Sequence, residues 1–268
     1  MDIDKTTREI RCREHIGCTA SVLQTQTLLT RSIALESASL ILVREGSKRV
    51  CWQHRDILLQ PGDAILIAAD CTLDVTNIRS SETGIYAAEW LSFPDALTTD
   101  EPHALYSLCG GFRQAFYHAR AAIMDPEAIP ERVAVKRMEE VQIWLEESGL
   151  RWAPVKAEKL SRQVRKRVSD DLARQWLAPD IAQHFAMSES TFRRRLAAEG
   201  MSFHQLLTEA RMCHALTLLQ VTDMAVNQVA LAVGYESPSK FTARFRTRFG
   251  FNPAQIRERL AIIASDFV

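Results

Sequence analysis

Cationic and hydroxyl-bearing side chains gather in one short segment near the C-terminal end of the sequence. Pro238–Gly250 contains four cations and no acid, together with Ser239 and Thr242. Lysine and arginine contact nucleic-acid phosphates, and arginine and serine also hydrogen-bond to base edges. A solvated helix face usually mixes charges of both signs, so this composition favours an anionic partner over an ordinary exposed surface.

A second segment, Glu189–Ala198, carries similar chemistry. It contains Ser190 and three successive arginines, of which Arg194 is expected to point outward with Arg193 on its flank. For these arginines alone, a binding face and an ordinary solvated face are equally good interpretations.

Each segment is expected to be the second helix of a two-helix unit. A short helix, a tight turn and a second helix follow one another twice, at 179–186 and 189–198, and again at 226–233 and 238–249. At about 100° per residue, Phe192 and Leu196 face inward in the first unit, and Phe241, Phe245 and Phe249 do so in the second. This is the helix-turn-helix arrangement, which places its second helix in the DNA major groove.

That geometry selects the candidate DNA contacts. The residues expected to reach base edges are Ser190, Arg194, Ser239 and Lys240. Those expected to contact phosphates or flank the bases are Arg193, Arg244, Arg246 and Arg248, and Thr242 faces outward with them.

The remaining C-terminal sequence is also helical by pattern. Ser188 and Ser237 are suited to cap helices, and Pro179 suits a helix start. In addition to the two units, helices are expected at 161–174, 203–219 and 253–262. The helix at 203–219 would separate the units by about 25 Å, close to the ~34 Å of one DNA turn once the helix diameter is added. Both second helices can then enter successive major-groove segments.

The N-terminal part has a different pattern. Short apolar runs separated by turn residues predict the strands of a small barrel or a double sheet, at 39–43, 50–52, 57–59, 64–67 and 84–88. Between 101 and 149 the period becomes helical, and two helices are expected. Their apolar stripes either pack on the strands or form a dimer interface, and include Leu105, Phe112, Phe116, Val141 and Leu145.

Length and charge agree with this division. A chain of 268 residues favours two domains, and we expect an α+β multidomain protein with domains at 1–150 and 161–268 and a linker at 151–160. The net charge is zero, but 161–268 holds 15 Lys and Arg against 10 Asp and Glu. No apolar run approaches the ~18 residues of a membrane span, and the acidic start is unlike a signal peptide. We therefore expect a cytoplasmic protein with no membrane partner.

The second unit also carries a family pattern. Gly234-Tyr235-x-x-Pro238-Ser239-x-Phe241-x-x-Arg244-Phe245-x-x-x-Phe249-Gly250-x-Asn252-Pro253 resembles the signature of the AraC/XylS transcription regulators, and Arg211-x-x-x-Ala215-x-x-Leu218-Leu219 resembles their linker helix. Lys240 stands where an aromatic residue is common in that family, and Ala243 where a basic residue is common. The resemblance covers about 161–260. The sequence at 188–203 is most similar to the branch of acid-resistance and enteric virulence activators.

The resemblance implies a sequence-specific activator of transcription that binds double-stranded DNA and acts on RNA polymerase. It also implies a cupin-like β-barrel for sensing at the N-terminus and a helical pair for homodimerisation. In the related virulence branch some members hold a fatty acid between their domains.

We therefore expect a small apolar or fatty-acid effector in the barrel or at the seam between the domains. Leu40, Leu42, Ile65 and Ile67 would supply apolar walls. The candidate cations for a carboxylate are Arg31, Lys48, Arg49 and Arg55. The alternatives are a core packed without any ligand and control by a protein partner.

Enzyme function is disfavoured by what the sequence lacks. A metal-dependent cupin enzyme needs a His-x-His pair, a Glu and a later His, but only His54 lies in that region. The six cysteines form no CxxC pair and are expected to be free, mostly buried thiols. We expect no catalytic residue, no metal and no cofactor. A cupin-type enzyme fused to a DNA-binding domain is the least favoured alternative.

Overall fold

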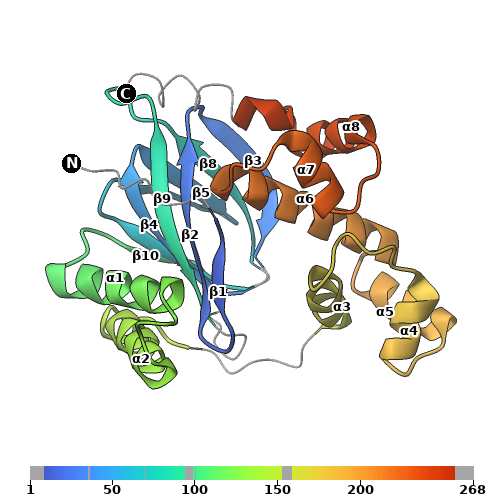
Figure 1. The fold of residues 1–268 in the computed structure, drawn as a ribbon, viewed down its shortest axis with the longest axis horizontal. Coiled ribbons are helices and arrows are strands. Elements are labelled where there is room, and N and C mark those ends of the chain that lie inside the picture. The colour runs from blue at the N-terminus through green and yellow to red at the C-terminus, as the bar shows by residue number, and fades with distance from the viewer. Residues whose placement is uncertain are drawn as a thin grey trace. The chain divides into compact units, whose positions relative to one another are not determined.

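The computed structural model describes residues 9–35, 37–69, 71–93, 99, 101–152 and 159–256. These residues separate into two compact units. The first contains the described residues up to 152 together with 220–223 and 256, and the second contains 159–219 and 224–255. The first is rich in β-sheet, and the second is helical (Figure 1). Residues 153–158 of the expected linker and 257–262 of the last expected helix lie outside the described residues.

The strands of the N-terminal unit form two antiparallel sheets. The six-stranded sheet has the order β1 (Arg11–Arg13), β2 (Gly17–Gln24), β9 (Tyr86–Ser92), β4 (Ser39–Glu45), β7 (Ala64–Ile67) and β10 (His103–Leu105). The four-stranded sheet has the order β3 (Leu28–Ala34), β8 (Thr72–Ile78), β5 (Ser47–Trp52) and β6 (Arg55–Leu59). Within the described residues no ladder joins the two sheets into a closed barrel. The double sheet is therefore the alternative that the structure supports.

The six-stranded sheet is buried on both faces. Because successive side chains of a strand point to opposite faces, Leu40 and Leu42 pack with the helices, whereas Ile65 and Ile67 pack against the four-stranded sheet. All four residues of β7 are buried, which explains why its sequence shows an apolar run without alternation. The four residues expected to supply apolar walls for an effector therefore face two different layers of the core.

The two expected helices are α1 (Gly110–Met124) and α2 (Glu131–Glu147), and they lie side by side (Figure 1). Phe112, Phe116, Val141 and Leu145 are all buried in one cluster with the six-stranded sheet. Leu105 belongs to β10 and not to a helix, because its backbone pairs with Ala64 of β7. These five side chains therefore pack within the protein, so a dimer interface on these helices requires other residues.

The cysteines differ from the expectation of free, mostly buried thiols. Cys12 and Cys18 are cross-strand partners in the β1–β2 hairpin and form a disulfide. Cys51 and Cys109 are free but exposed. The hairpin register brings Cys12 and Cys18 together, and their sequence spacing alone does not reveal it.

The helical unit contains α3 (Leu160–Ser169), α4 (Ala178–His184), α5 (Glu189–Ala198), α6 (Phe203–Val221), α7 (Val226–Ala232), α8 (Pro238–Phe249) and the 3-10 turn η1 (Pro253–Ile256). The first helix ends five residues earlier than expected. Asp171 explains this, since its carboxylate accepts the N–H of Arg174 and its carbonyl accepts the indole N–H of Trp176, both of which favour a turn. Among the described helices, none is both long enough and apolar enough to cross a membrane.

Candidate nucleic-acid interface

Helices α4 and α5 form the first helix-turn-helix unit. Phe192 and Leu196 lie fully buried beneath α5, as the helical period predicts. The Ser188 Oγ accepts the N–H of Thr191 at 3.3 Å and caps the helix. Ala186, in the turn after α4, lies in the left-handed region with φ of 53°, which redirects the chain toward α5.

The outward face of α5 is only partly available to a partner. Arg193 forms an ion pair with Glu189 one turn earlier, with Nε 2.8 Å from Oε1. Ser190 is exposed, and its Oγ lies 3.1 Å from the Oγ of Ser188. Arg194 is exposed and makes no ion pair with any described residue. Arg195 is also exposed and makes no ion pair with a described residue, but its Nη1 contacts Sδ of Met187 at 3.9 Å. Arg194 is therefore the arginine of α5 whose guanidinium makes no ion pair or hydrogen bond with a described side chain.

Helices α7 and α8 form the second unit. Phe241, Phe245 and Phe249 line the inner face of α8 and contact one another in tilted pairs, with successive ring centroids 5.6 and 4.7 Å apart. Ser237 caps the helix by accepting the N–H of Lys240, and Pro238 occupies the first turn, where it loses no hydrogen bond. Gly250 ends the helix with φ of 84°. The apolar stripe and both caps fix which side of α8 faces solvent.

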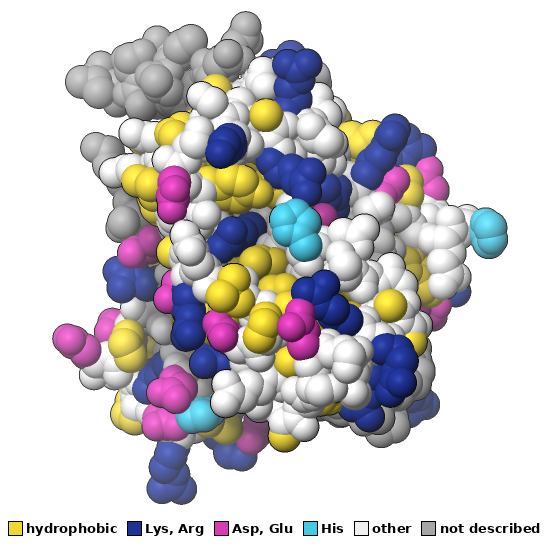
Figure 2. All heavy atoms as spheres, turned by 90° about the vertical axis from the view of Figure 1, so that its right-hand side faces the viewer, with side chains coloured by type: hydrophobic (Ala, Val, Ile, Leu, Met, Phe, Trp, Pro, Cys, Tyr) yellow, Lys and Arg dark blue, Asp and Glu magenta, His cyan; other side chains and the backbone are white. Residues whose placement is uncertain are grey.

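Exposed cations remain on the outward side of α8. Lys240 and Arg246 are exposed and form no ion pair with a described residue. Arg244 is exposed, and its positive charge lies near the hydroxyl of Tyr235. Burial raises the pKa of that hydroxyl, and Arg244 opposes the shift. Basic side chains recur over the molecular face drawn in Figure 2, with acidic ones among them.

Arg248 differs from the other cations of α8. Its guanidinium is held by Glu209 of α6, with Nε 2.7 Å from Oε2, and it lies over the ring of Phe249. Its side chain is only 18% exposed. The structure therefore does not bring Arg248 to the outward face with Lys240 and Arg246, and its visible role is to join α8 to α6.

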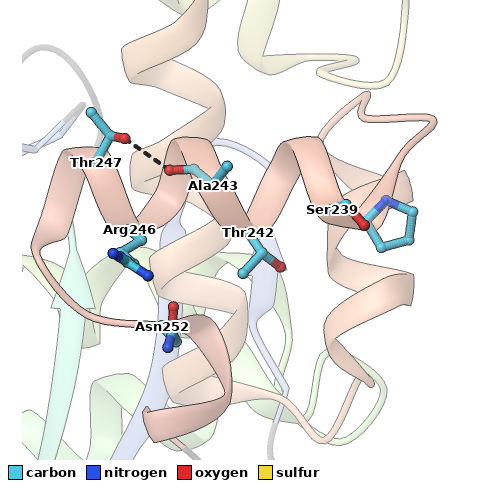
Figure 3. Close-up of a pocket in the computed structure, with 7 residues that line it drawn as sticks. Ser239, Thr242, Ala243, Arg246, Thr247 and Asn252 are labelled. Carbon is cyan, nitrogen blue, oxygen red and sulfur yellow. Dashed lines mark hydrogen bonds between the residues drawn. The ribbon is translucent and has the colours of Figure 1, made fainter.

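A hollow of about 600 Å³ lies along the outward side of α8. The lining comes from the helix and the loop after it, and consists of Pro238, Ser239, Thr242, Ala243, Arg246, Thr247 and Asn252. Figure 3 shows Arg246 and Thr242 on the side of α8 that faces Asn252. Three residues expected to face outward, Ser239, Thr242 and Arg246, thus share one concave surface.

Asn252 is a lining residue that the helical period did not identify. It follows α8 in a loop, where its N–H donates to Oε1 of Gln255 at 2.7 Å and its carbonyl accepts the N–H of Gln255. These bonds position the loop beside Arg246. The pair Asn252-Pro253 directly after a helix-ending glycine was the available signal, because asparagine before proline is typical of a turn that initiates a helix.

Arg211 of α6 joins the second unit to the segment between α3 and α4. Its Nε donates to the carbonyl of Leu172 at 3.1 Å, and its Nη2 donates to the carbonyl of Arg174 at 2.9 Å. Gly234, at the turn between α7 and α8, packs directly against this guanidinium and the Leu172 carbonyl. Burial lowers the pKa of Arg211, and Tyr235 opposes the shift. The turn between α7 and α8 therefore packs against a half-buried cation.

Glu199 performs a similar task in the first unit. Its two carboxylate oxygens each accept a backbone N–H of α3, from Leu160 and Ser161, at 2.9 Å. Burial acts to raise the pKa of Glu199, but these hydrogen bonds outweigh it and the pKa is lowered. The end of α5 is thereby attached to the start of α3.

The four cations expected to meet an effector lie apart. Arg49 forms an exposed ion pair with Asp56, and Arg55 forms one with Glu101 at 3.0 Å. Arg31 is exposed, whereas Lys48 is buried at 5% exposure. Within the described part of the chain no group of three or more His, Cys, Asp or Glu side chains is arranged to hold a metal ion.

Sequence comparison places the C-terminal part among known regulators. Residues 181–259 match the family described as "Helix-turn-helix domain". The chain is 36% identical over 94 residues to the HTH-type transcriptional regulator GadX of Escherichia coli (strain K12), and 36% identical over 93 residues to the virulence regulon transcriptional activator VirF of Shigella flexneri. Each match covers 35% of this chain, and 34% of GadX or 36% of VirF. The chain thus spans about a third of the length of these relatives.

Structural comparison extends over nearly the whole chain. ToxT from Vibrio cholerae strain SCE256, solved with a bound unsaturated fatty acid, aligns with a TM-score of 0.60 over 95% of this chain and 96% of its own. ToxT from Vibrio cholerae O395 aligns with a TM-score of 0.61 over 90% of this chain and 96% of its own. The identities are 11% and 13%, so the likeness shows a shared fold. That fold joins a sheet-rich N-terminal domain to a helical C-terminal domain.

Proposed function

We propose that this chain, which carries an AraC-type helix-turn-helix domain over residues 181–259, is a sequence-specific DNA-binding regulator of transcription. The observation that carries the proposal is the outward side of α8. There, Ser239, Thr242 and Arg246 line one hollow, and the exposed Lys240 lies on the same helix. A concave surface with cations and hydroxyl groups suits contacts to phosphates and base edges.

The proposed division of labour follows exposure and pairing. Base edges are contacted by Ser190, Arg194, Ser239 and Lys240, with Thr242 and Asn252 beside them. Phosphates are contacted by Arg193, Arg244 and Arg246. Arg248 acts on DNA only indirectly, by holding α8 against α6 through Glu209. The two units would enter successive major-groove segments, since α6 has 19 residues and spans about 28 Å.

Selection of binding sites from random double-stranded DNA tests the proposal directly. The purified full chain should enrich a defined sequence, and the selected duplex should bind more tightly than random duplex at moderate salt. Arg194→Ala should weaken the preferred duplex by about 1–3 kcal/mol and relax specificity, whereas Arg244→Ala should weaken all duplexes alike. Failure to enrich any sequence would exclude specific recognition.

We propose further that the protein is cytoplasmic, activates transcription by contacting RNA polymerase, and works as a homodimer. Exposed apolar side chains on α2, namely Val133, Val135 and Ile143, support a contact between copies of the helical pair. Light scattering at micromolar concentration, with and without the selected duplex, tests the dimer. A reconstituted transcription assay on a promoter with the selected sequence tests activation, and a reduced transcript level would instead indicate a repressor.

The sheet-rich domain is proposed to be a cupin-like sensing domain for a small apolar or fatty-acid effector. The likeness to ToxT, which has been solved with a fatty acid, supports this choice over control by a protein partner. An effector acts only through different affinities for the DNA-competent and DNA-incompetent states. DNA binding measured with and without added fatty acids separates these two modes of control.

A further inference from the structure

A cluster of polar side chains is buried between the two sheets of the N-terminal unit. Gln24, the last residue of β2, is 0% exposed, and Thr25, which follows the strand, is 1% exposed. Tyr86 of β9 is 0% exposed. Lys48 of β5 and Asn77 of β8 face them from the other sheet. The adjoining core between the sheets is apolar, so polar groups at this position require an explanation.

Three contacts and the strand registers hold the cluster together. The Lys48 ammonium donates to Oδ1 of Asn77 at 2.7 Å, and Nδ2 of Asn77 donates to Oε1 of Gln24. The same ammonium lies 5.5 Å from the ring centroid of Tyr86. Gln24 pairs with Tyr86 within one sheet, and Lys48 pairs with Asn77 within the other. Gln24, Lys48, Asn77 and Tyr86 therefore form one site that bridges the sheets, and Thr25 follows Gln24 in the chain.

The site contains more donors than acceptors. Nε2 of Gln24, Oη of Tyr86 and Oγ1 of Thr25 are buried and have no hydrogen-bond partner among the described residues. Each is a group that donates a hydrogen bond, and a buried donor without a partner costs about 1–3 kcal/mol. The Lys48 ammonium has two further protons beyond the one given to Asn77. Unused donors around a single cation are complementary to an anion.

The charge of the cluster limits the kind of anion. Lys48 is the only cation of the cluster. Its neighbours on the adjacent strands are Leu59 of β6, Asn77 of β8 and Tyr86 of β9. Gln24 of β2 is connected to it through Asn77. None of these is an acid. One cation matches a monoanion, and a phosphate dianion would leave an uncompensated charge in an apolar interior.

We propose that this cluster binds the carboxylate of a monocarboxylic acid with an apolar tail, with Lys48, Gln24 and Tyr86 as its donors. The inference deepens the effector part of the proposed function and selects Lys48 from the four cations considered. Arg49 and Arg55 are already paired with Asp56 and Glu101 at the surface, and Arg31 is exposed. Lys48 alone combines burial, the absence of an acid partner and neighbouring unused donors.

Proton uptake gives the proposal a specific signature. Burial lowers the pKa of Lys48 to about 7, so at pH 8 most molecules carry a neutral amine. A bound carboxylate favours the charged form and raises this pKa. Binding at pH 8 should therefore take up close to one proton, and affinity should fall as the pH rises above 7. An exposed lysine, charged throughout this range, would show neither effect.

The experiment is calorimetric titration of the full chain with decanoate at pH 8 in buffers of different ionisation enthalpy, and again at pH 6.5. We expect binding with proton uptake, tighter at pH 6.5, and no binding of decan-1-ol. Lys48→Met should weaken decanoate binding about 30-fold or more, since truncating one partner of a buried charged contact typically costs 2–5 kcal/mol. Tyr86→Phe should weaken it by a smaller factor.

The variants are chosen so that folding does not obscure the result. Lys48→Met removes a buried, uncompensated charge and keeps the length of the side chain, so it should raise the unfolding temperature. Arg79→Met, a change at an exposed cation of the same unit, should bind decanoate as the natural chain does. Equal binding by the Lys48→Met variant, binding without proton uptake, or no binding of decanoate by the natural chain would each overturn the assignment. Specific DNA binding by the same preparations would show that the proposed regulator function survives such a failure.

Discussion

The two helix-turn-helix units share a backbone design but present different charges to solvent. In both, a serine caps the second helix and aromatic side chains anchor it from beneath. On α5 the ion pair with Glu189 partly neutralises Arg193 and leaves Arg194 and Arg195 without an ion pair to a described residue. On α8, Glu209 compensates Arg248, but the three exposed cations Lys240, Arg244 and Arg246 have no acid on their helix. The available positive charge is therefore greater on the second unit, and the difference suggests that α8 contributes more of the sequence-independent affinity.

The turns of the two units also differ in whether they have room for a side chain. Ala186 and Gly234 both donate to the carbonyl three residues earlier, and both adopt a left-handed conformation, with φ of 53° and 79°. Ala186 is exposed, but Gly234 is packed against Arg211 and the Leu172 carbonyl. The same turn is therefore a surface feature in the first unit and a packing contact in the second.

The largest effect is expected from Gly234→Ala. A Cβ at this position would lie 2.6 Å from the Leu172 carbonyl oxygen, and the left-handed conformation adds its own strain. We expect the free energy of unfolding of the helical unit to fall by about 2–4 kcal/mol. Urea unfolding, with hydrogen exchange of α7 and α8 amides, measures it. A loss below about 1 kcal/mol would mean that the two turns are equivalent.

The next effect concerns the unequal charge of the two outward helices. Arg246→Ala should weaken binding to all duplexes by about 1–3 kcal/mol and reduce the salt dependence by about one phosphate contact. Arg193→Ala should reduce the salt dependence by less, because Glu189 already compensates Arg193. Fluorescence anisotropy across a salt series gives both slopes. Equal changes for the two variants would contradict the proposed dominance of α8.

Arg248→Ala serves as a control on the same helix. Since Glu209 holds Arg248, this change should lower the stability of the helical unit while leaving the salt slope of DNA binding nearly unchanged.

A smaller effect is expected from Ala186→Gly in the first turn. Glycine relieves about 1–2 kcal/mol of left-handed strain in the folded state. It also raises the conformational entropy of the unfolded chain, which lowers the unfolding free energy by about 0.4–1 kcal/mol. The net gain in unfolding free energy should be up to about 1 kcal/mol, measured by urea unfolding. This sign is opposite to that of Gly234→Ala, so a loss of stability would show that the Ala186 methyl makes a contact that matters.

The smallest effect is expected from Glu189→Gln. This change frees Arg193 and removes a negative charge from the outward face of α5, and it should raise DNA affinity about twofold at low salt, or ~0.4 kcal/mol. Anisotropy at low and high salt tests it, because screening should abolish the gain. A gain that persists at high salt would point to a direct contact by residue 189.

The local sequence pattern was sufficient to predict the two outward helices of the helical domain, α5 and α8. Caps at Ser188 and Ser237, a proline in the first turn and aromatic residues at helical spacing define α5 and α8 without reference to the rest of the chain. The helical period also assigns Ser239, Thr242 and Arg246 to one face, where they line one hollow. These features depend on neighbours within a few residues, which is why sequence alone determines them.

Only the tertiary structure determined which partner each of several chemically similar side chains meets. Arg246 and Arg248 lie two residues apart on one helix, but only Arg248 meets a glutamate from another helix. Lys48 and Arg49 are adjacent on β5, and the pleat sends one into the interior and the other to Asp56 at the surface. The register of the hairpin likewise joined Cys12 to Cys18. Each outcome depends on a partner that is distant in sequence or on strand pairing, and a side chain's type carries no information about which partner the fold will bring to it.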